Sequence, residues 1–279
     1  MTRRELQRLL RELGVQPSRR LGQNFLVDRN TLHWMMRQAD PRPGEWVLEI
    51  GPGTGILTDR LIAAGANVVA IEYDARLVAY LERKYDGNHV IRIIQGDAAR
   101  TDFDDINRTH PYKCMANLPY SASTNIISRF LATENRPGKL FLLLQSEMAA
   151  RLAASPGSKV YGALSVQAQA LYDVSVLRTI SASVFWPEPG VDSAFVEFDL
   201  QAQPIDPVEY RHLAKLVRQA FSQRRKKLIN VLKSGVGSHR LAESFQALGL
   251  DGNLRAEDLT VDQFIALARR LEIRDAGFE

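Results

Sequence analysis

Short apolar runs that alternate with amphipathic stretches constrain the fold of this chain more than any other feature. The runs cover residues 45–50, 68–72, 90–95, 113–117 and 140–145. Helical patterns lie between them at 54–64, 75–85 and 123–132. Strands that alternate with helices predict an α/β fold, in which a parallel sheet carries helices on both faces. Two later runs, 170–180 and 194–200, predict a final hairpin that flanks the proline-rich loop 186–190 and completes the sheet.

A second, helical region follows Pro204 and Pro207, which end the last strand. Asp206 can cap a new helix, and Thr260 with Gln263 matches a capping box. Apolar residues recur at helical spacing after both caps. At 279 residues, the chain accommodates one domain of about 200 residues and a smaller one. We therefore expect a domain at 1–203, with a basic arm at 1–20, and a small all-α domain at 204–279.

The charge is distributed unevenly although the net charge is only +4. Residues 1–20 hold six arginines against Glu5 and Glu12, and residues 211–240 hold nine basic residues and no acid. The rest of the chain therefore carries −9. An acidic body with two basic patches indicates polyanionic partners at the patches.

Several classes of protein are excluded. No apolar run approaches the roughly 20 residues needed to span a bilayer, and the N-terminus shows no apolar signal segment, so we expect a cytoplasmic protein without a membrane partner. A single cysteine, Cys114, excludes internal disulfides and Cys-based zinc sites. The five histidines do not fall at metal-ligand spacing, so we expect no metal site.

A glycine-rich loop, Gly51-Pro-Gly-Thr-Gly55, follows the first predicted strand and precedes a helix. Backbone N–H groups at such a junction can contact a ligand. Ile56 stands where the dinucleotide fingerprint has its third glycine, and the Lys-Ser/Thr ending of a phosphate-binding loop is absent. Taken alone, the loop is as consistent with a plain tight turn as with a cofactor site.

Acidic residues at the ends of three successive strands favour the cofactor site. Glu49 ends the first strand, Glu72 ends the second, and Asp97 follows the third. An acid in the position of Glu72 accepts hydrogen bonds from ribose hydroxyls, and Asp97 could address an adenine amino group. Three acids repel phosphates but suit a cationic nucleoside. We therefore expect S-adenosylmethionine as cofactor.

The segment Asn117-Leu-Pro-Tyr120 follows the fourth strand, at the same edge of the predicted sheet. The Asn117 side-chain oxygen and the Leu118 carbonyl can accept hydrogen bonds from an exocyclic amine. Pro119 makes the segment rigid, and Tyr120 can stack on the base that carries the amine. As an isolated tetrapeptide it would more often be a simple turn. Its position reverses that preference and favours methyl transfer to an exocyclic nitrogen.

Two further residues have alternative interpretations. A thiol nucleophile at Cys114 would suit methylation of a ring carbon, but its place inside an apolar strand favours packing. Phe185, before the proline-rich loop, either packs in the core or forms the second face of a base sandwich opposite Tyr120. The residues alone favour neither role for Phe185.

With these residues assembled, the chain resembles the rRNA adenine N6,N6-dimethyltransferases, above all those of the small subunit. The resemblance covers almost the whole length. The motifs that carry it are Leu21-Gly-Gln-Asn-Phe-Leu-Val-Asp28, Glu49-Ile-Gly-Pro-Gly-Thr-Gly55, Gln95-Gly-Asp97, Asn117-Leu-Pro-Tyr120, Lys159-Val-Tyr-Gly162, Pro187-Glu-Pro-Gly-Val-Asp-Ser193, Phe221-Ser-Gln-Arg-Arg-Lys226 and Arg255-Ala-Glu257.

The resemblance implies a Rossmann-like class I methyltransferase sheet with a small helical C-terminal domain. It implies dimethylation of two adjacent adenines in the 3′-terminal hairpin of 16S rRNA, within an assembling small subunit, by a monomeric enzyme. The implied cofactor contacts are Asn24, Leu26, Gly51, Gly53, Glu72, Asp97 and Asn117. The implied adenine contacts are Asn117, Leu118, Pro119, Tyr120 and Phe185. Gly190 and Ser146 stand where basic residues are common in the family. These two differences affect only the expected local RNA contacts.

Both basic patches, the N-terminal arm and residues 211–240, then acquire a role in binding rRNA. The C-terminal patch offers rRNA a phosphate-binding surface on a helical segment. Its expected RNA-binding residues are Arg218, Arg224, Arg225, Lys226, Lys227 and Lys233. A merely solvated charged face is the alternative. Two other functions also stay open: dimethylation of large-subunit rRNA, as in macrolide resistance, and a non-catalytic RNA-binding assembly or transcription factor on the same fold.

Overall fold

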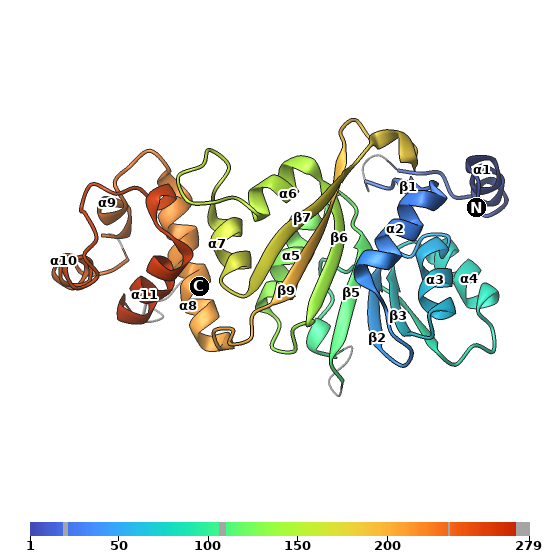
Figure 1. Ribbon diagram of the computed structural model, residues 1–279, viewed down its shortest axis with the longest axis horizontal. Coiled ribbons are helices and arrows are strands. Elements are labelled where there is room, and N and C mark those ends of the chain that lie inside the picture. The colour runs from blue at the N-terminus through green and yellow to red at the C-terminus, as the bar shows by residue number, and fades with distance from the viewer. Residues whose placement is uncertain (19–21, 106–109, 234, 272–279) are drawn as a thin grey trace. The chain divides into compact units, whose positions relative to one another are not determined.

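The computed structural model describes residues 1–18, 22–105, 110–233 and 235–271 (Figure 1). Its contacts divide the chain into two compact units. The N-terminal unit comprises Met1–Ala149 and Ser175–Asp199, and the C-terminal unit comprises Ala150–Val174 and the described part of Leu200–Glu279. Of the basic N-terminal arm, Arg19 and Arg20 lie outside the described residues, as does Leu21 of the motif that follows.

A seven-stranded sheet in the order β4-β3-β2-β5-β6-β9-β7 organises the chain. Its strands are β2 (Trp46–Ile50), β3 (Asn67–Glu72), β4 (Ile91–Gln95), β5 (Tyr112–Asn117), β6 (Lys139–Gln145), β7 (Tyr172–Ile180) and β9 (Ser193–Leu200). The pairs β4–β3, β3–β2, β2–β5 and β5–β6 are parallel, and β9 runs antiparallel to β6. The predicted α/β fold with a final hairpin is confirmed, with strand ends shifted by one or two residues.

The central strands are buried on both faces, which explains why their sequences are continuous apolar runs. In β6 all five residues from Leu140 to Leu144 are buried, whereas the edge strand β4 is only half-buried. The connecting helices are α3 (Ile56–Ala63), α4 (Ala75–Lys84), α5 (Ser123–Ala132) and α6 (Ser146–Leu152). Figure 1 shows α3 and α4 beside the β2–β3 end of the sheet, where α3 packs on β3 and α4 on β3 and β4.

Three elements near the N-terminus complete this unit. Helix α1 (Arg3–Glu12) begins with a capping box of Thr2 and Glu5, and α2 (Arg29–Ala39) is capped by Asp28. The two-residue strand β1 (Phe25–Leu26) pairs antiparallel with β8 (Phe185–Trp186), which follows the short 3₁₀ helix η2 (Ala182–Val184). The basic arm is therefore largely a helix, which the charge pattern alone does not indicate.

The C-terminal unit is mainly helical. Its helices are α7 (Ala163–Gln169), α8 (Pro207–Ala220), α9 (Leu228–Leu232), α10 (Ser238–Ala247) and α11 (Val261–Leu271). Asp206 caps α8, and the Thr260–Gln263 capping box forms as predicted. The predicted division at residue 203 differs from the contacts, because α7 packs against α8 and the Tyr161 hydroxyl donates to the Leu259 carbonyl at 3.1 Å. Residues 150–174 therefore group with the C-terminal helices.

Across the described ranges, no helix has the length and apolar character needed to cross a membrane. Within the same ranges, no group of three or more histidine, cysteine or acidic side chains could hold a metal ion.

Candidate active site

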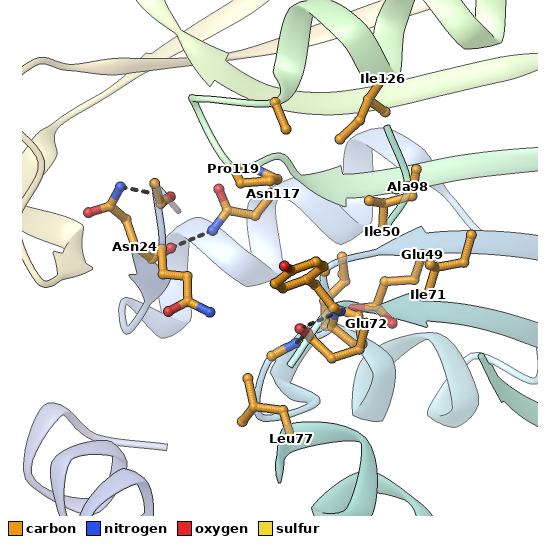
Figure 2. A pocket seen from close by; sticks show the side chains of 18 of the residues that line it. Asn24, Glu49, Ile50, Ile71, Glu72, Leu77, Ala98, Asn117, Pro119 and Ile126 are labelled. Atoms are coloured by element: carbon orange, nitrogen blue, oxygen red, sulfur yellow. Dashed lines mark hydrogen bonds between the residues drawn. The ribbon is translucent and has the colours of Figure 1, made fainter. Parts of the chain in front are cut away.

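A cavity of about 490 Å³ opens at the carboxyl ends of β2, β3, β4 and β5 (Figure 2). Every residue expected to contact the cofactor lines this cavity: Asn24, Leu26, Gly51, Gly53, Glu72, Asp97 and Asn117. These residues come from β1, from the strand ends and from the loops that follow them. The fold thus brings together positions that are up to 93 residues apart in the sequence.

The glycine loop between β2 and α3 requires its glycines. Gly51, Gly53 and Gly55 all have positive φ, at 68°, 59° and 77°, where other residues are strained. A Cβ on Gly53 would also stand 3.0 Å from the Phe25 ring. No side chain caps α3, so the positive end of that helix is left for a ligand in the cavity.

Glu72 is the most strongly held acid of the cavity. Its Oε2 accepts from Gly53 N at 3.0 Å, and its Oε1 accepts from Tyr73 N at 2.8 Å and Asp74 N at 3.0 Å. Burial raises the pKa of Glu72, and the three backbone donors oppose that rise. The carboxylate therefore ties the end of β3 to the glycine loop as well as facing the cavity.

The other two acids differ from each other. Asp97 caps a turn through Ala99 N at 2.9 Å and lies 3.6 Å from the Arg100 guanidinium, with its side chain partly exposed. Glu49 is fully buried and accepts from Thr58 Oγ1 at 2.7 Å. Burial raises its pKa to about 8, so its carboxyl is mainly neutral at pH 7. Of the three expected negative charges, the one at Glu49 is therefore mainly absent at pH 7.

Asn117 lies at the end of β5 with its amide fixed in one orientation. Its Nδ2 donates to the Asn24 carbonyl at 2.7 Å (Figure 2). This bond leaves Oδ1 as the acceptor of the amide. In the described part of the chain, neither Asn117 Oδ1 nor the Leu118 carbonyl receives a hydrogen bond. Asn117 lines the cavity, whereas Leu118, the next residue, is 1% exposed and is not among the residues that line it.

The other residues of the predicted catalytic loop, Leu118 to Tyr120, lie in different surroundings. Pro119 lines the cavity, whereas the Leu118 side chain is buried in the core. Tyr120 is half-buried, and its hydroxyl lies 2.5 Å from Ser193 Oγ on β9. Burial raises the pKa of Tyr120, so the phenol is neutral at physiological pH. Tyr120 is not among the residues that line the cavity.

For Phe185 and Cys114 the structure favours packing. Phe185 is 1% exposed and belongs to the core cluster that includes Leu26 and Phe195, so its ring has no free face for a base. This arrangement corrects the expected sandwich with Tyr120, because the pairing of β8 with β1 directs Phe185 inward. Cys114 is fully buried, and burial raises the pKa of its thiol, which excludes a thiolate at neutral pH.

The expected RNA-binding residues lie in the C-terminal unit, and all six are exposed. The segment Arg224–Lys227 was expected on a helix, but it lies between η3 (Phe221–Gln223) and α9. Arg224 pairs with Glu257 at 2.6 Å, and Lys227 donates to Asn253 at 2.6 Å. Arg225 and Lys226 form no ion pair with any other described residue.

Known proteins resemble this chain over most of its length. The model of the family described as "Ribosomal RNA adenine dimethylase" matches residues 15–272. The chain belongs to the ribosomal RNA adenine dimethylase family. It is accordingly a methyltransferase, and its cofactor is S-adenosylmethionine.

Two curated relatives illustrate how similar other members of the dimethylase family are. Both are named "Ribosomal RNA small subunit methyltransferase A". The protein from Moorella thermoacetica is 38% identical over 95% of this chain and 96% of its own length. The protein from Corynebacterium jeikeium is 37% identical over 95% of this chain and 93% of its own length.

Solved structures support the fold of this dimethylase. A dimethyladenosine transferase from Plasmodium falciparum superposes with a TM-score of 0.73 at 23% identity, covering 87% of this chain and 95% of that one. The 23S rRNA methyltransferase ErmE gives a TM-score of 0.68 at 23% identity, covering 89% and 100%. Together with the mostly parallel sheet, these likenesses confirm the class I methyltransferase fold.

Three residues of this dimethylase site were not predicted from the sequence. Ser193 holds the Tyr120 hydroxyl, Tyr73 lines the cavity with its ring exposed, and Gly22 approaches the Tyr120 backbone so closely that a Cβ would stand 2.8 Å from Tyr120 N. Ser193 and Gly22 lie inside motifs that carry the family resemblance. The signal was therefore present, although nothing local to either residue indicates its contact.

Proposed function

We propose that this chain transfers methyl groups from S-adenosylmethionine to the N6 amines of two adjacent adenines in the 3′-terminal hairpin of 16S rRNA. The substrate would be the assembling small subunit, and the enzyme would act as a cytoplasmic monomer. Family membership and the small-subunit relatives support this assignment. The observation that carries it is the Asn117 amide, whose Nδ2 is held by the Asn24 carbonyl so that Oδ1 is left as an acceptor in the lining of a cavity suited to the cofactor.

The residues of the cavity fit S-adenosylmethionine chemically. Glu72 and Asp97 supply acceptors for the ribose hydroxyls and the adenine amine, and the uncapped start of α3 supplies a positive end for the carboxylate. Acidic side chains at Glu72 and Asp97 in the lining favour a cationic ligand over a phosphorylated one. When bound, S-adenosylmethionine supplies a methyl group on a sulfonium, which is an electrophilic carbon with a neutral leaving group.

Asn117 and Leu118 then act on the target amine. Asn117 Oδ1 and the Leu118 carbonyl accept hydrogen bonds from the two N–H groups of the amine. These two hydrogen bonds orient the nitrogen lone pair toward the methyl carbon. The lone pair forms the N–C bond while the C–S bond breaks and its electrons return to sulfur. The nitrogen becomes positively charged and releases one proton to water, so no strong base is required from the chain.

Asn24 and Tyr120 are positioning groups in this proposal. The Asn24 carbonyl holds Nδ2 of Asn117 and thereby keeps Oδ1, the acceptor, available to the amine. Tyr120, held by Ser193, would stack on one face of the adenine. Because Phe185 is buried, the proposal includes no second aromatic face from that residue.

The deciding experiment incubates the protein with methyl-labelled S-adenosylmethionine and small subunits that lack the modification. Nuclease digestion and mass spectrometry should find N6,N6-dimethyladenosine at two adjacent positions near the 3′ end of 16S rRNA. Label that appears only in large-subunit rRNA, or no label with a competent assay, would reject the proposal.

Asn117→Ala should lower kcat by about 10²–10³-fold, because it removes one acceptor for the amine. Affinity for S-adenosylhomocysteine should fall less than about tenfold, since one of several cavity contacts is lost. Asn67→Ala is the matched control, because Asn67 Nδ2 also donates to a backbone carbonyl, that of Gly44, outside the cavity. Equal losses in both variants would remove Asn117 from the mechanism.

A further inference from the structure

Helix α5 contributes to the cavity an amide that has no role in the function proposed above. Asn125, the third residue of α5, is exposed and lines the cavity. Within the described part of the chain, its side chain has no hydrogen-bond partner. An amide offers an acceptor and two donors in one plane, so Asn125 can recognise a ligand that presents a donor next to an acceptor.

The contacts of α5 show which part of the cavity wall this helix packs against. Three of them join α5 to the segment that follows β4. They pair Arg129 Nε with the Thr101 carbonyl at 2.7 Å, the Phe130 ring with the Phe103 ring at 4.2 Å between centroids, and the Thr133 hydroxyl with the Asp104 carboxylate. Later residues of α5 therefore meet later residues of that segment.

The same register, continued one turn back, places Asn125 beside Asp97. Asn125 precedes Arg129 by four residues and so lies on the same face of α5. Asp97 precedes Thr101 by four residues, and its carbonyl accepts from Thr101 N at 2.9 Å. Ile126 and Ala98, the residues that follow Asn125 and Asp97, both line the cavity as well (Figure 2). Asn125 thus adjoins the acid expected to bind the adenine amine.

Asp97 and Ala98 offer groups for only one side of an adenine. Asp97 Oδ1 accepts from Ala99 N at 2.9 Å, whereas Oδ2 lies 3.6 Å from Arg100 Nε, beyond hydrogen-bond distance. Ala98 is buried, and its N–H has no partner among the described residues, which is rare for a buried donor. This acceptor and donor match N6–H and N1 of adenine, and they leave the second N6–H and N7 without a partner.

We propose that Asn125 binds the N7 side of the cofactor adenine, with Oδ1 accepting from the N6 amine and Nδ2 donating to N7. An Asn amide matches these two adenine atoms bidentately, as it does in the recognition of adenine in nucleic acids. The inference rests on the proposed function for the place of the adenine at Asp97. It makes Asn125 a specificity residue, which favours adenine over rings that lack the amine or N7.

The test compares S-adenosylhomocysteine with its 7-deaza analogue, in which a C–H group replaces N7. Isothermal titration calorimetry with the full chain gives both Kd values. The wild type should bind the 7-deaza analogue about fivefold more weakly, since one hydrogen bond is lost. A wild type that binds the two compounds equally overturns the inference.

Asn125→Ala should remove the preference for N7. Its Kd for S-adenosylhomocysteine should rise about five- to thirtyfold, because two hydrogen bonds are lost. Its Kd values for the two compounds should then agree within about twofold. An Asn125→Ala protein that keeps the wild-type preference overturns the inference, because N7 is then recognised by another group.

Asn125→Asp should reverse the preference. Its carboxylate can still accept from the N6 amine, but it has no donor and repels the lone pair of N7. The 7-deaza analogue should therefore bind more tightly than S-adenosylhomocysteine. A residue that only supports α5 would produce no such reversal, so an Asp variant that still prefers S-adenosylhomocysteine contradicts the proposal.

Thr124→Ala is the matched control, because Thr124 is exposed in the same turn of α5 and does not line the cavity. It should keep the wild-type preference for S-adenosylhomocysteine. Equal loss of the preference in Thr124→Ala and Asn125→Ala would overturn the inference, since the effect would then come from the helix. The proposed function fails separately, when the wild type binds S-adenosylhomocysteine but does not methylate small subunits.

Discussion

At the scale of single residues, Glu49 is the least expected part of the site. Sequence position suggested one more negative charge at the sheet edge, but the carboxyl is fully buried beneath the glycine loop and bonded to Thr58. A folded-state pKa of about 8, well above the ordinary value of 4.5, means that the folded protein retains a proton which the unfolded chain releases. Glu49 therefore acts mainly as a hydrogen-bonded neutral group.

Glu49 should make stability depend on pH. Its contribution is fully present below pH 4.5 and is lost as the pH rises through about 8, because only the unfolded chain ionises in that window. Between pH 5 and pH 8, the free energy of unfolding of Glu49→Gln relative to the wild type should rise by roughly 2–4 kcal/mol, at about 1.4 kcal/mol per pKa unit. Urea denaturation without cofactor measures this difference. A difference that does not change with pH would show that Glu49 is ionised in the fold.

Gly22 determines how closely the N-terminal segment approaches the catalytic loop. It has a φ of 65°, and an added Cβ would stand 2.8 Å from Tyr120 N. Gly22→Ala should therefore displace the loop and lower kcat by about tenfold, since small misplacements of reacting groups are costly. Gly14→Ala is the control, because Gly14 shares the positive φ, with a strain of about 1 kcal/mol, but has open space around it. Similar kcat values in the two variants would contradict this role.

At the scale of elements, the end of α4 holds the glycine loop from outside the cavity. Lys84 Nζ donates to the Thr54 carbonyl at 3.2 Å, and the Tyr85 hydroxyl donates to the Gly55 carbonyl at 3.1 Å. Both also bond to Asp59 of α3, at 2.8 Å each. The loop conformation thus depends on α3 and α4 together as well as on its own glycines.

Tyr85→Phe should weaken binding of S-adenosylhomocysteine about three- to tenfold, because it removes a hydrogen bond worth about 1 kcal/mol from the loop that contacts the cofactor. Isothermal titration calorimetry measures the change. Tyr80→Phe, in the same helix, is the matched control and should bind like the wild type. A Tyr85→Phe protein with wild-type affinity would show that the glycines alone hold the loop.

The ease of prediction differed among elements for a physical reason. The strands β2, β3, β5 and β6 are buried on both faces, so their apolar runs indicate them directly. The two-residue strands β1 and β8 are too short to show a period, and their pairing depends on distant residues. The same limit applies to the contact between the Asn24 carbonyl and Asn117, and it explains why Phe185 could not be assigned from sequence.

At the scale of the whole molecule, the cofactor residues were predictable because parallel strands place their carboxyl ends at one edge. The seven expected positions all line one cavity, and their roles remain predictions for binding experiments. The grouping of residues 150–174 with the C-terminal helices was not predictable, since contacts such as Tyr161 to Leu259 leave no local pattern.

Charge is also distributed at this scale, and the structure divides the basic C-terminal segment into two kinds of residue. Arg224 and Lys227 bond within their unit, whereas Arg225 and Lys226 are exposed without an ion pair to the rest of the described chain. If the segment binds rRNA, Arg225→Gln/Lys226→Gln should reduce the slope of log K against log salt by about 1.5. Arg224→Gln should instead lower Tm through loss of the pair with Glu257. An unchanged slope in the double variant would indicate that Arg225 and Lys226 form a solvated charged surface that does not bind rRNA.

The pairing of β1 with β8 affects how the protein is made. Phe25 and Leu26 leave the ribosome early, but their partners Trp186 and Phe185 are synthesised much later. The N-terminal segment must therefore wait, unpaired, while most of the sheet is translated. Because the Asn24 carbonyl adjoins this strand, we expect the acceptor geometry at Asn117 to be completed only after residue 186 of the 279 has been made. A nascent chain released before β8 would fold much of its sheet and still be unable to methylate.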